Sequence, residues 1–220
     1  MAKFIRNLNN KSYSLQGSER PSILLFAEGN AEAFFLDIWL DRAAYDANDI
    51  AVILVGGDRD KLTPHFKKFV EDENFSFVTT FGFFYDAERH SASHTVEFIK
   101  RLLQKHRLIS PNTKLIAGSQ TVGDIKIGIF LSPDNASPGW IEELVKREIE
   151  STELVGCMNE FAESVRKVTG ETIHSKTFAQ AYLGIRQPGL CGTANGFKAA
   201  HFDVMHPAYD EVRKVISSLL

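Results

Sequence analysis

Residues 23–35 constrain the fold most, because a short apolar run there passes directly into a helical pattern. The run 23–27 has no polar break, which predicts a buried strand of a parallel sheet. Gly29 follows at the point where the chain must turn from strand to helix, and we expect it to supply that flexible turn. Glu28 would then end the strand, and Glu32 would lie on the first turn of the helix. In open α/β sheets, ligands bind at this edge.

The same order of strand and helix recurs along the chain, which predicts a three-layer α/β/α fold with a mostly parallel central sheet. Further apolar runs predict strands at 50–55, 81–86 and 125–131, each followed by a helical pattern. The pattern from about 151 is mainly helical and ends in a helix over roughly 207–219. We therefore expect a single domain over 1–220, with a core at about 21–150 and a helical C-terminal region at about 151–220.

Two stretches leave alternatives open. The polar residues 1–20 predict an arm that either stays outside the sheet or adds an edge strand. Residues 75–78 either extend the sheet or lead into the strand at 81–86.

The composition is that of a soluble globular protein with a formal net charge of −3. The chain has no long run of Lys or Arg, so its overall charge does not indicate a nucleic-acid-binding protein. Only a local basic patch could bind nucleic acid. The two cysteines, Cys157 and Cys191, form neither a disulfide framework nor a zinc pattern, which predicts a reduced, cytoplasmic setting. No apolar run reaches membrane-spanning length and the N-terminus has no signal-peptide pattern, so we expect no membrane partner.

Acidic residues follow three of the predicted strands. Glu28 with Glu32, Asp86 with Glu88, and Asp134 all stand at strand-to-helix junctions. Parallel strands with right-handed crossovers bring such junctions to one sheet edge. Because clustered carboxylates repel one another, a cation would stabilise the group, and oxygen-only ligands favour Mg²⁺ or Mn²⁺. The chemistry that fits is phosphodiester cleavage or phosphoryl transfer.

Each of these acids also has a simpler interpretation as a helix cap or turn former. For Asp134 alone the two interpretations are equally good, since it precedes the helix that begins after Pro138. The Glu28/Glu32 and Asp86/Glu88 pairs taken together favour the metal site.

At these residues the sequence resembles a Toprim domain, the metal-binding α/β domain of topoisomerases, bacterial primases, recombination proteins and overcoming-lysogenization-defect (OLD) nucleases. That family has a strand ending in acid-glycine, here Glu28-Gly29, and a later acid-x-acid motif, here Asp86-Ala87-Glu88. Glu88 departs from the usual second aspartate. Glu32, four residues after Glu28, is more similar to the OLD nucleases than to the topoisomerases.

Most of the chain resembles an uncharacterised family of stand-alone Toprim-like proteins of bacteria and archaea. The similarity extends to Pro133-Asp134-Asn135 with Gly139 and Glu142, to Lys176 ahead of Gln187-Pro188-Gly189, and to Phe202-Asp203. It implies a metal-dependent nuclease, or a Toprim-like partner of an ATPase in genome or phage defence.

Basic and glycine-rich positions are weaker candidates. The resemblance implies that Lys176 contacts a scissile phosphate or offsets transition-state charge, as a lysine does in OLD-like nucleases; a solvated helix lysine is the alternative. Arg89 and His90 either meet a phosphate or form an ion pair with the neighbouring acids. Gly56-Gly57 either binds a phosphate through backbone N–H groups or forms a turn.

Two functions follow from these observations. The first is a Mg²⁺- or Mn²⁺-dependent nuclease with Glu28, Asp86 and Lys176 in catalysis; its predicted metal ligands are Glu28, Glu32, Asp86, Glu88 and Asp134. The second is a non-catalytic interaction or regulatory module that binds a protein or nucleotide, which the near-neutral charge favours. A homo-oligomer is compatible with either function.

Overall fold

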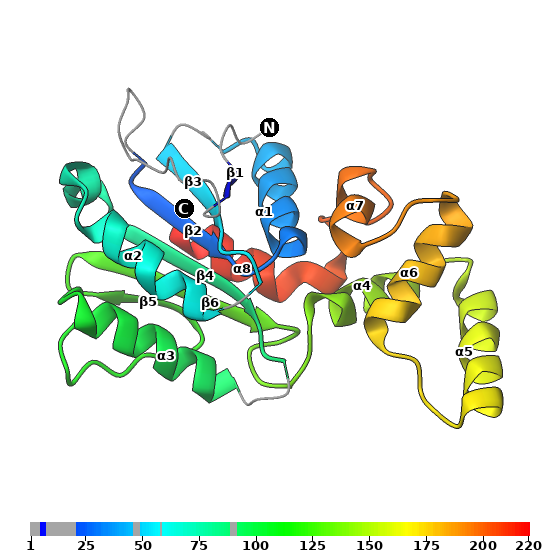
Figure 1. Ribbon diagram of the computed structural model, residues 1–220. Coiled ribbons are helices and arrows are strands. Elements are labelled where there is room, and N and C mark those ends of the chain that lie inside the picture. Colours follow the sequence, from blue (N-terminus) through cyan, green and yellow to red (C-terminus); the bar gives the residue numbers. More distant parts are fainter. Residues whose placement is uncertain (1–4, 8–20, 46–48, 58, 89–91) are drawn as a thin grey trace.

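The computed structural model describes residues 5–7, 21–45, 49–57, 59–88 and 92–220 (Figure 1). None of the helices within these ranges is long and apolar enough to cross a membrane. The strands are β1 (Ile5–Asn7), β2 (Ile23–Ala27), β3 (Ile50–Leu54), β4 (Thr80–Asp86), β5 (Gly118–Val122) and β6 (Ile125–Ser132). The α-helices are α1 (Asn30–Arg42), α2 (Leu62–Val70), α3 (Ala92–Lys105), α4 (Ile141–Ile149), α5 (Val155–Thr169), α6 (Ser175–Arg186), α7 (Thr193–Lys198) and α8 (Asp210–Leu219).

The six strands form one sheet in the order β1-β3-β2-β4-β6-β5. All neighbouring pairs are parallel except β5 with β6, which are antiparallel. In register, Ala27 of β2 lies beside Phe84 of β4, and Asp86 of β4 lies beside Ser132 of β6. The carboxyl ends of β2, β4 and β6 therefore meet at one edge of the sheet, as the sequence predicts.

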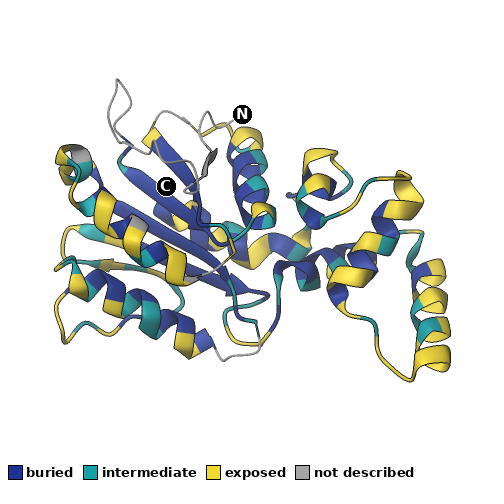
Figure 2. Cartoon of the chain, viewed as in Figure 1, coloured by how far each residue is buried: buried dark blue, intermediate teal, exposed yellow. Residues whose placement is uncertain are grey.

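Each face of the sheet carries its own apolar core, because successive side chains of a strand point to opposite faces. Leu25 and Ala27 pack with α1, α4 and α8, whereas Leu24 and Phe26 pack with α2 and α3. Figure 2 shows the strands buried between these helices. The structure confirms the predicted three-layer α/β/α arrangement.

The C-terminal region returns to the sheet through α8. Gly82 and Gly128 are register partners on β4 and β6, and Leu219 packs against both. A Cβ at position 128 would lie 2.7 Å from Leu219 Cδ1, so these glycines provide the room for α8. Helices α5 and α6 lie beyond the sheet, with α5 farthest out and largely exposed (Figures 1 and 2). The predicted helical C-terminal region is confirmed.

The structure decides between the alternatives for part of the N-terminal arm and for residues 75–78. Ile5–Asn7 pairs with β3, so this part of the arm adds an edge strand, and residues 1–4 and 8–20 lie outside the described residues. Glu73–Phe77 is a 3₁₀ helix, so residues 75–78 lead into β4 and do not extend the sheet.

Candidate metal centre

Two predicted site residues meet where the chain changes from one face of the sheet to the other. β2 continues into α1 on one face, and its neighbour β4 leads to α3 on the opposite face. In open α/β sheets, this kind of switch point opens the crevice that binds ligands. Glu28 follows β2 and Asp86 ends β4, so the topology places both carboxylates at the switch point.

Backbone N–H groups donate hydrogen bonds to the carboxylates of Glu28 and Glu32. The N–H of Asp86 donates to Glu28 Oε2 at 2.9 Å, and the N–H of Gly29 donates to Glu32 Oε2 at 3.0 Å. The backbone of Gly29 is extended, at φ −125°, so no left-handed turn requires a glycine here. The need is for space, because a Cβ at position 29 would lie 2.9 Å from Glu32 Oε2. The expected flexible turn is therefore corrected to a close approach of the Glu32 carboxylate.

A fourth acid joins them from the start of α4. The N–H of Ile141 donates to Asp86 Oδ1 at 2.9 Å, which draws this helix onto the end of β4. Glu142, the next residue, is only 7% exposed and accepts a hydrogen bond from Thr193 Oγ1 at 2.9 Å. We call Glu28, Glu32, Asp86 and Glu142 the acid cluster. Glu142 was absent from the predicted ligands, although it belongs to the motif that carries the resemblance.

The four acids share one electrostatic environment. Burial, with the negative charges of Glu28 and Glu142, raises the pKa of Glu32 to about 7. Burial, with the charges of Glu32, Glu28 and Glu142, raises the pKa of Asp86 well above its usual value. Both causes disfavour the charged carboxylate. The cluster thus accumulates negative charge that a proton or a cation would offset.

This arrangement predicts a pH-dependent stability for the metal-free protein. The folded protein binds the Glu32 proton more tightly than the unfolded chain, in which the pKa is near 4.5. The free energy of unfolding should therefore fall by about 3 kcal/mol as the pH rises from about 4.5 to about 7. Urea unfolding in EDTA at pH 5 and pH 8 measures this loss. Glu32→Gln should reduce it markedly, and the same pH dependence in both proteins would contradict the assignment.

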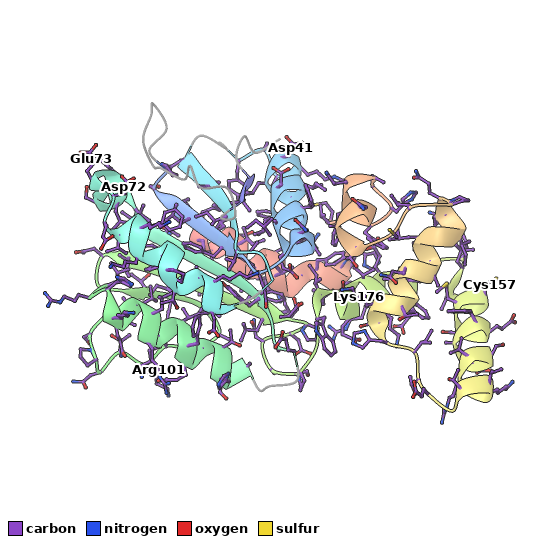
Figure 3. The ribbon with its side chains drawn as sticks, viewed as in Figure 1. Asp41, Asp72, Glu73, Arg101, Cys157 and Lys176 are labelled. Atoms are coloured by element: carbon purple, nitrogen blue, oxygen red, sulfur yellow. The ribbon has the colours of Figure 1, made fainter. Side chains whose placement is uncertain are left out.

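A cavity of about 390 Å³ opens beside the acid cluster. Glu32, Asp86 and Glu142 line it, together with the N-terminus of α1 and residues of the C-terminal region. Lys176, at the beginning of α6, also lines it and is exposed (Figure 3). The structure thus brings three sequence-predicted residues, Glu32, Asp86 and Lys176, to one cavity.

Of the three remaining predicted ligands, Glu28 belongs to the acid cluster but is not among the residues that line the cavity, and the other two lie elsewhere. Glu88 has a left-handed backbone, at φ 52°, and its N–H donates to the Gly139 carbonyl at 2.9 Å. Asp134 Oδ1 accepts the N–H groups of Ala136 and Ser137, and these bonds, with Arg147 nearby, lower the pKa of Asp134 despite its partial burial. Neither Glu88 nor Asp134 is among the residues that line the cavity. For Asp134, these contacts favour the turn-forming alternative.

Of the remaining weaker candidates, the structure describes only the glycine pair. The N–H groups of Gly56 and Gly57 both donate to the carbonyl of Glu28, at 3.0 and 2.7 Å, so this glycine pair is a turn beside β2. Arg89 and His90 lie outside the described residues.

The acid cluster fits a divalent cation by its donor chemistry, since its ligands would all be carboxylate oxygens. Among the residues that the structure describes, no three His, Cys, Asp or Glu side chains already lie in the arrangement of a bound metal ion. The carboxylates instead accept hydrogen bonds from Gly29, Asp86, Ile141 and Thr193. Ligation therefore requires these side chains to rearrange.

Comparison with known proteins agrees with the extent of this fold. A family model described as a protein of unknown function, DUF3226, matches residues 22–220. The chain belongs to the DUF3226 family. The match includes every residue of the acid cluster and Lys176. A search of curated proteins found no match.

One solved structure resembles the chain over most of its length. It is the crystal structure of a hypothetical protein, PH0156, from Pyrococcus horikoshii OT3. The TM-score is 0.59 at 11% sequence identity, and the similarity covers 90% of this chain and 94% of that one. At this identity the comparison supports the fold alone.

Proposed function

We propose that this DUF3226 protein is a Toprim-like, divalent-metal-dependent phosphodiesterase that hydrolyses nucleic acid. The observation that carries the proposal is the acid cluster at the β2/β4 switch point, beside a cavity that Lys176 also lines. Three of its carboxylates, those of Glu28, Glu32 and Glu142, are buried, and Asp86 is partly buried. Clustered carboxylates are costly to a fold, and raised pKa values such as those of Glu32 and Asp86 are concentrated at functional sites. The Toprim resemblance of Glu28-Gly29 and Asp86-Ala87-Glu88 supports the same assignment.

Each part of the site has a defined role in this proposal. Carboxylates of the acid cluster would hold Mg²⁺ or Mn²⁺, which supplies Lewis-acid polarisation of a phosphate and a bound water of lowered pKa. Lys176 would place a positive charge beside the same phosphate. The Glu88–Gly139 and Asp86–Ile141 hydrogen bonds fix the start of α4, and with it Glu142, against the end of β4.

A direct test incubates the purified protein with supercoiled plasmid, single-stranded DNA and RNA, in Mg²⁺, Mn²⁺ or EDTA. Cleavage that requires the metal supports the proposal, provided that it co-elutes with the protein through a final gel-filtration step. Metal binding without cleavage would indicate that the protein needs an activating partner, for which the resemblance suggests an ATPase.

The second candidate is a non-catalytic module that binds a nucleotide or a protein. The carboxylates of the acid cluster already accept hydrogen bonds from backbone N–H groups and from the Thr193 hydroxyl. These bonds give the carboxylates a structural role, which favours the second candidate. Under this alternative neither metal binding nor cleavage occurs. Calorimetric titration of the metal-free protein with Mn²⁺ separates the two candidates.

A further inference from the structure

The acid cavity has an aromatic wall that the proposed chemistry leaves unexplained. Trp140 and His174 both line the cavity, and their ring centroids lie 4.4 Å apart at an interplanar angle of 62°. Trp140 is only partly buried and His174 is exposed, although a large aromatic side chain is usually placed in a core. Two partly accessible rings beside buried acids form a surface on which a planar group can stack.

Both rings are held in place by the residues that build the site. Trp140 directly precedes Ile141, whose N–H donates to Asp86, so the position of its backbone is coupled to that carboxylate. His174 Nδ1 accepts the N–H of Lys176 at 3.2 Å. In the neutral ring this leaves the proton on Nε2, which makes that nitrogen a hydrogen-bond donor. The aromatic wall is thus preorganised, and Lys176 lies two residues from it.

The dimensions and charge of the cavity limit what can enter. A volume of about 390 Å³ is that of a small-molecule cavity. Lys176 is the one Lys or Arg among its described lining residues, and the chain carries a net charge of −3. Proteins that follow a duplex by its phosphates need several such cations. A single nucleotide outside its helix presents a base that can stack on an aromatic side chain and a phosphate that one cation can contact.

We propose that the acid cavity binds one unpaired nucleotide, with its base against Trp140 and His174 and its phosphate beside Lys176 and the acid cluster. This inference rests on the proposed function for its choice of nucleic acid, and it deepens that function by naming the substrate as single-stranded or locally unpaired. Aromatic stacking accepts every base, so the site should show little sequence preference.

The test measures binding of a fluorescein-labelled single-stranded oligonucleotide, (dT)8, by fluorescence anisotropy in EDTA and in Ca²⁺. Trp140→Leu should weaken binding about tenfold or more, since it removes the ring but keeps an apolar side chain, whereas Trp140→Phe should stay close to wild type. A blunt duplex of equal length should bind less tightly than (dT)8. Thermal unfolding of both variants checks that the fold is retained.

Tryptophan fluorescence gives an independent readout, because the chain has two tryptophans in different environments. Trp39 is 4% exposed, stacks on Tyr45 and is not among the residues that line the acid cavity. Unlabelled (dT)8 should quench the wild-type emission and leave that of Trp140→Phe, which retains only Trp39, unchanged. Quenching that persists in Trp140→Phe would overturn the inference.

The remaining outcomes separate this inference from the proposed function. It is overturned if (dT)8 fails to bind, if the duplex binds as tightly, or if a folded Trp140→Leu binds like the wild type. Metal-dependent cleavage with unaltered activity in Trp140→Leu would leave the phosphodiesterase assignment standing without the base site. Quenching of Trp140 by (dT)8 in a protein that neither binds Mn²⁺ nor cleaves would support the base site and contradict the enzyme.

Discussion

Asp86→Asn should abolish metal-dependent cleavage while leaving the fold intact. The asparagine oxygen can still accept the Ile141 N–H that holds α4 against β4. The substitution removes one negative charge from the acid cluster, which relieves repulsion in the metal-free protein but weakens its hold on a cation. Because metal ions contribute several kcal/mol to such reactions, the cleavage rate should fall by about 10²- to 10⁴-fold. Plasmid cleavage in Mn²⁺ measures this loss.

Asp134→Asn is the matched control for that experiment. It makes the same substitution at another strand-end acid, whose carboxylate contacts Ala136, Ser137 and Arg147. We expect its cleavage rate to stay within about twofold of wild type, since Asp134 does not line the acid cavity. A folded Asp86→Asn protein with full activity would contradict the site. An inactive but folded Asp134→Asn would restore Asp134 as a ligand.

Glu142→Gln should lower both the affinity for Mn²⁺ and the cleavage rate by about 10- to 100-fold, the loss typical of a residue that holds or orients a metal ligand. Its side chain is buried against Thr193, and its charge acts on both Glu32 and Asp86. Glutamine can still accept the Thr193 hydroxyl proton, so the packing of α7 against this region should persist. Calorimetric titration with Mn²⁺ gives the affinity separately from activity.

Glu143→Gln provides a control one residue away on the same helical turn. Glu143 does not line the acid cavity, and its charge is not among the causes that raise the pKa of Glu32 or Asp86. This variant should bind Mn²⁺ and cleave like the wild type. If Glu142→Gln and Glu143→Gln lost Mn²⁺ affinity and cleavage rate equally, a general change in charge at the start of α4 would explain the loss. The specific role of Glu142 would then be wrong.

The parts of the fold that follow from hydrophobic pattern could be predicted. β2, β3, β4 and β6 are continuous apolar runs because both faces of their sheet are covered. β5 could not be found in this way, since Gly118–Val122 is a polar edge strand whose residues are half-buried or exposed. Its signal is the Gly123-Asp124 turn that joins it to β6 as a hairpin, with Gly123 at φ 59°.

The candidate site could be predicted in part. Glu28 and Asp86 follow from parallel topology, because each stands directly at the end of a buried strand. Asp134 also stands after a strand, but the N–H groups of Ala136 and Ser137 hold its carboxylate in a turn. Glu142 reaches the acid cluster through the Asp86–Ile141 hydrogen bond. Such a tertiary contact leaves no local pattern, which explains why Glu142 was not among the predicted ligands whereas Asp134, which directly follows a strand, was.

The most direct test of the central claim is calorimetric titration of the metal-free protein with Mn²⁺ at pH 7.5, beside Asp86→Asn. We expect saturable binding to the wild type, with a matching rise in unfolding temperature, because a ligand that binds only the folded state stabilises it. Asp86→Asn should lose both effects. Absence of binding to the wild type at millimolar Mn²⁺, or equal binding by the two proteins, would contradict a metal centre at the acid cluster.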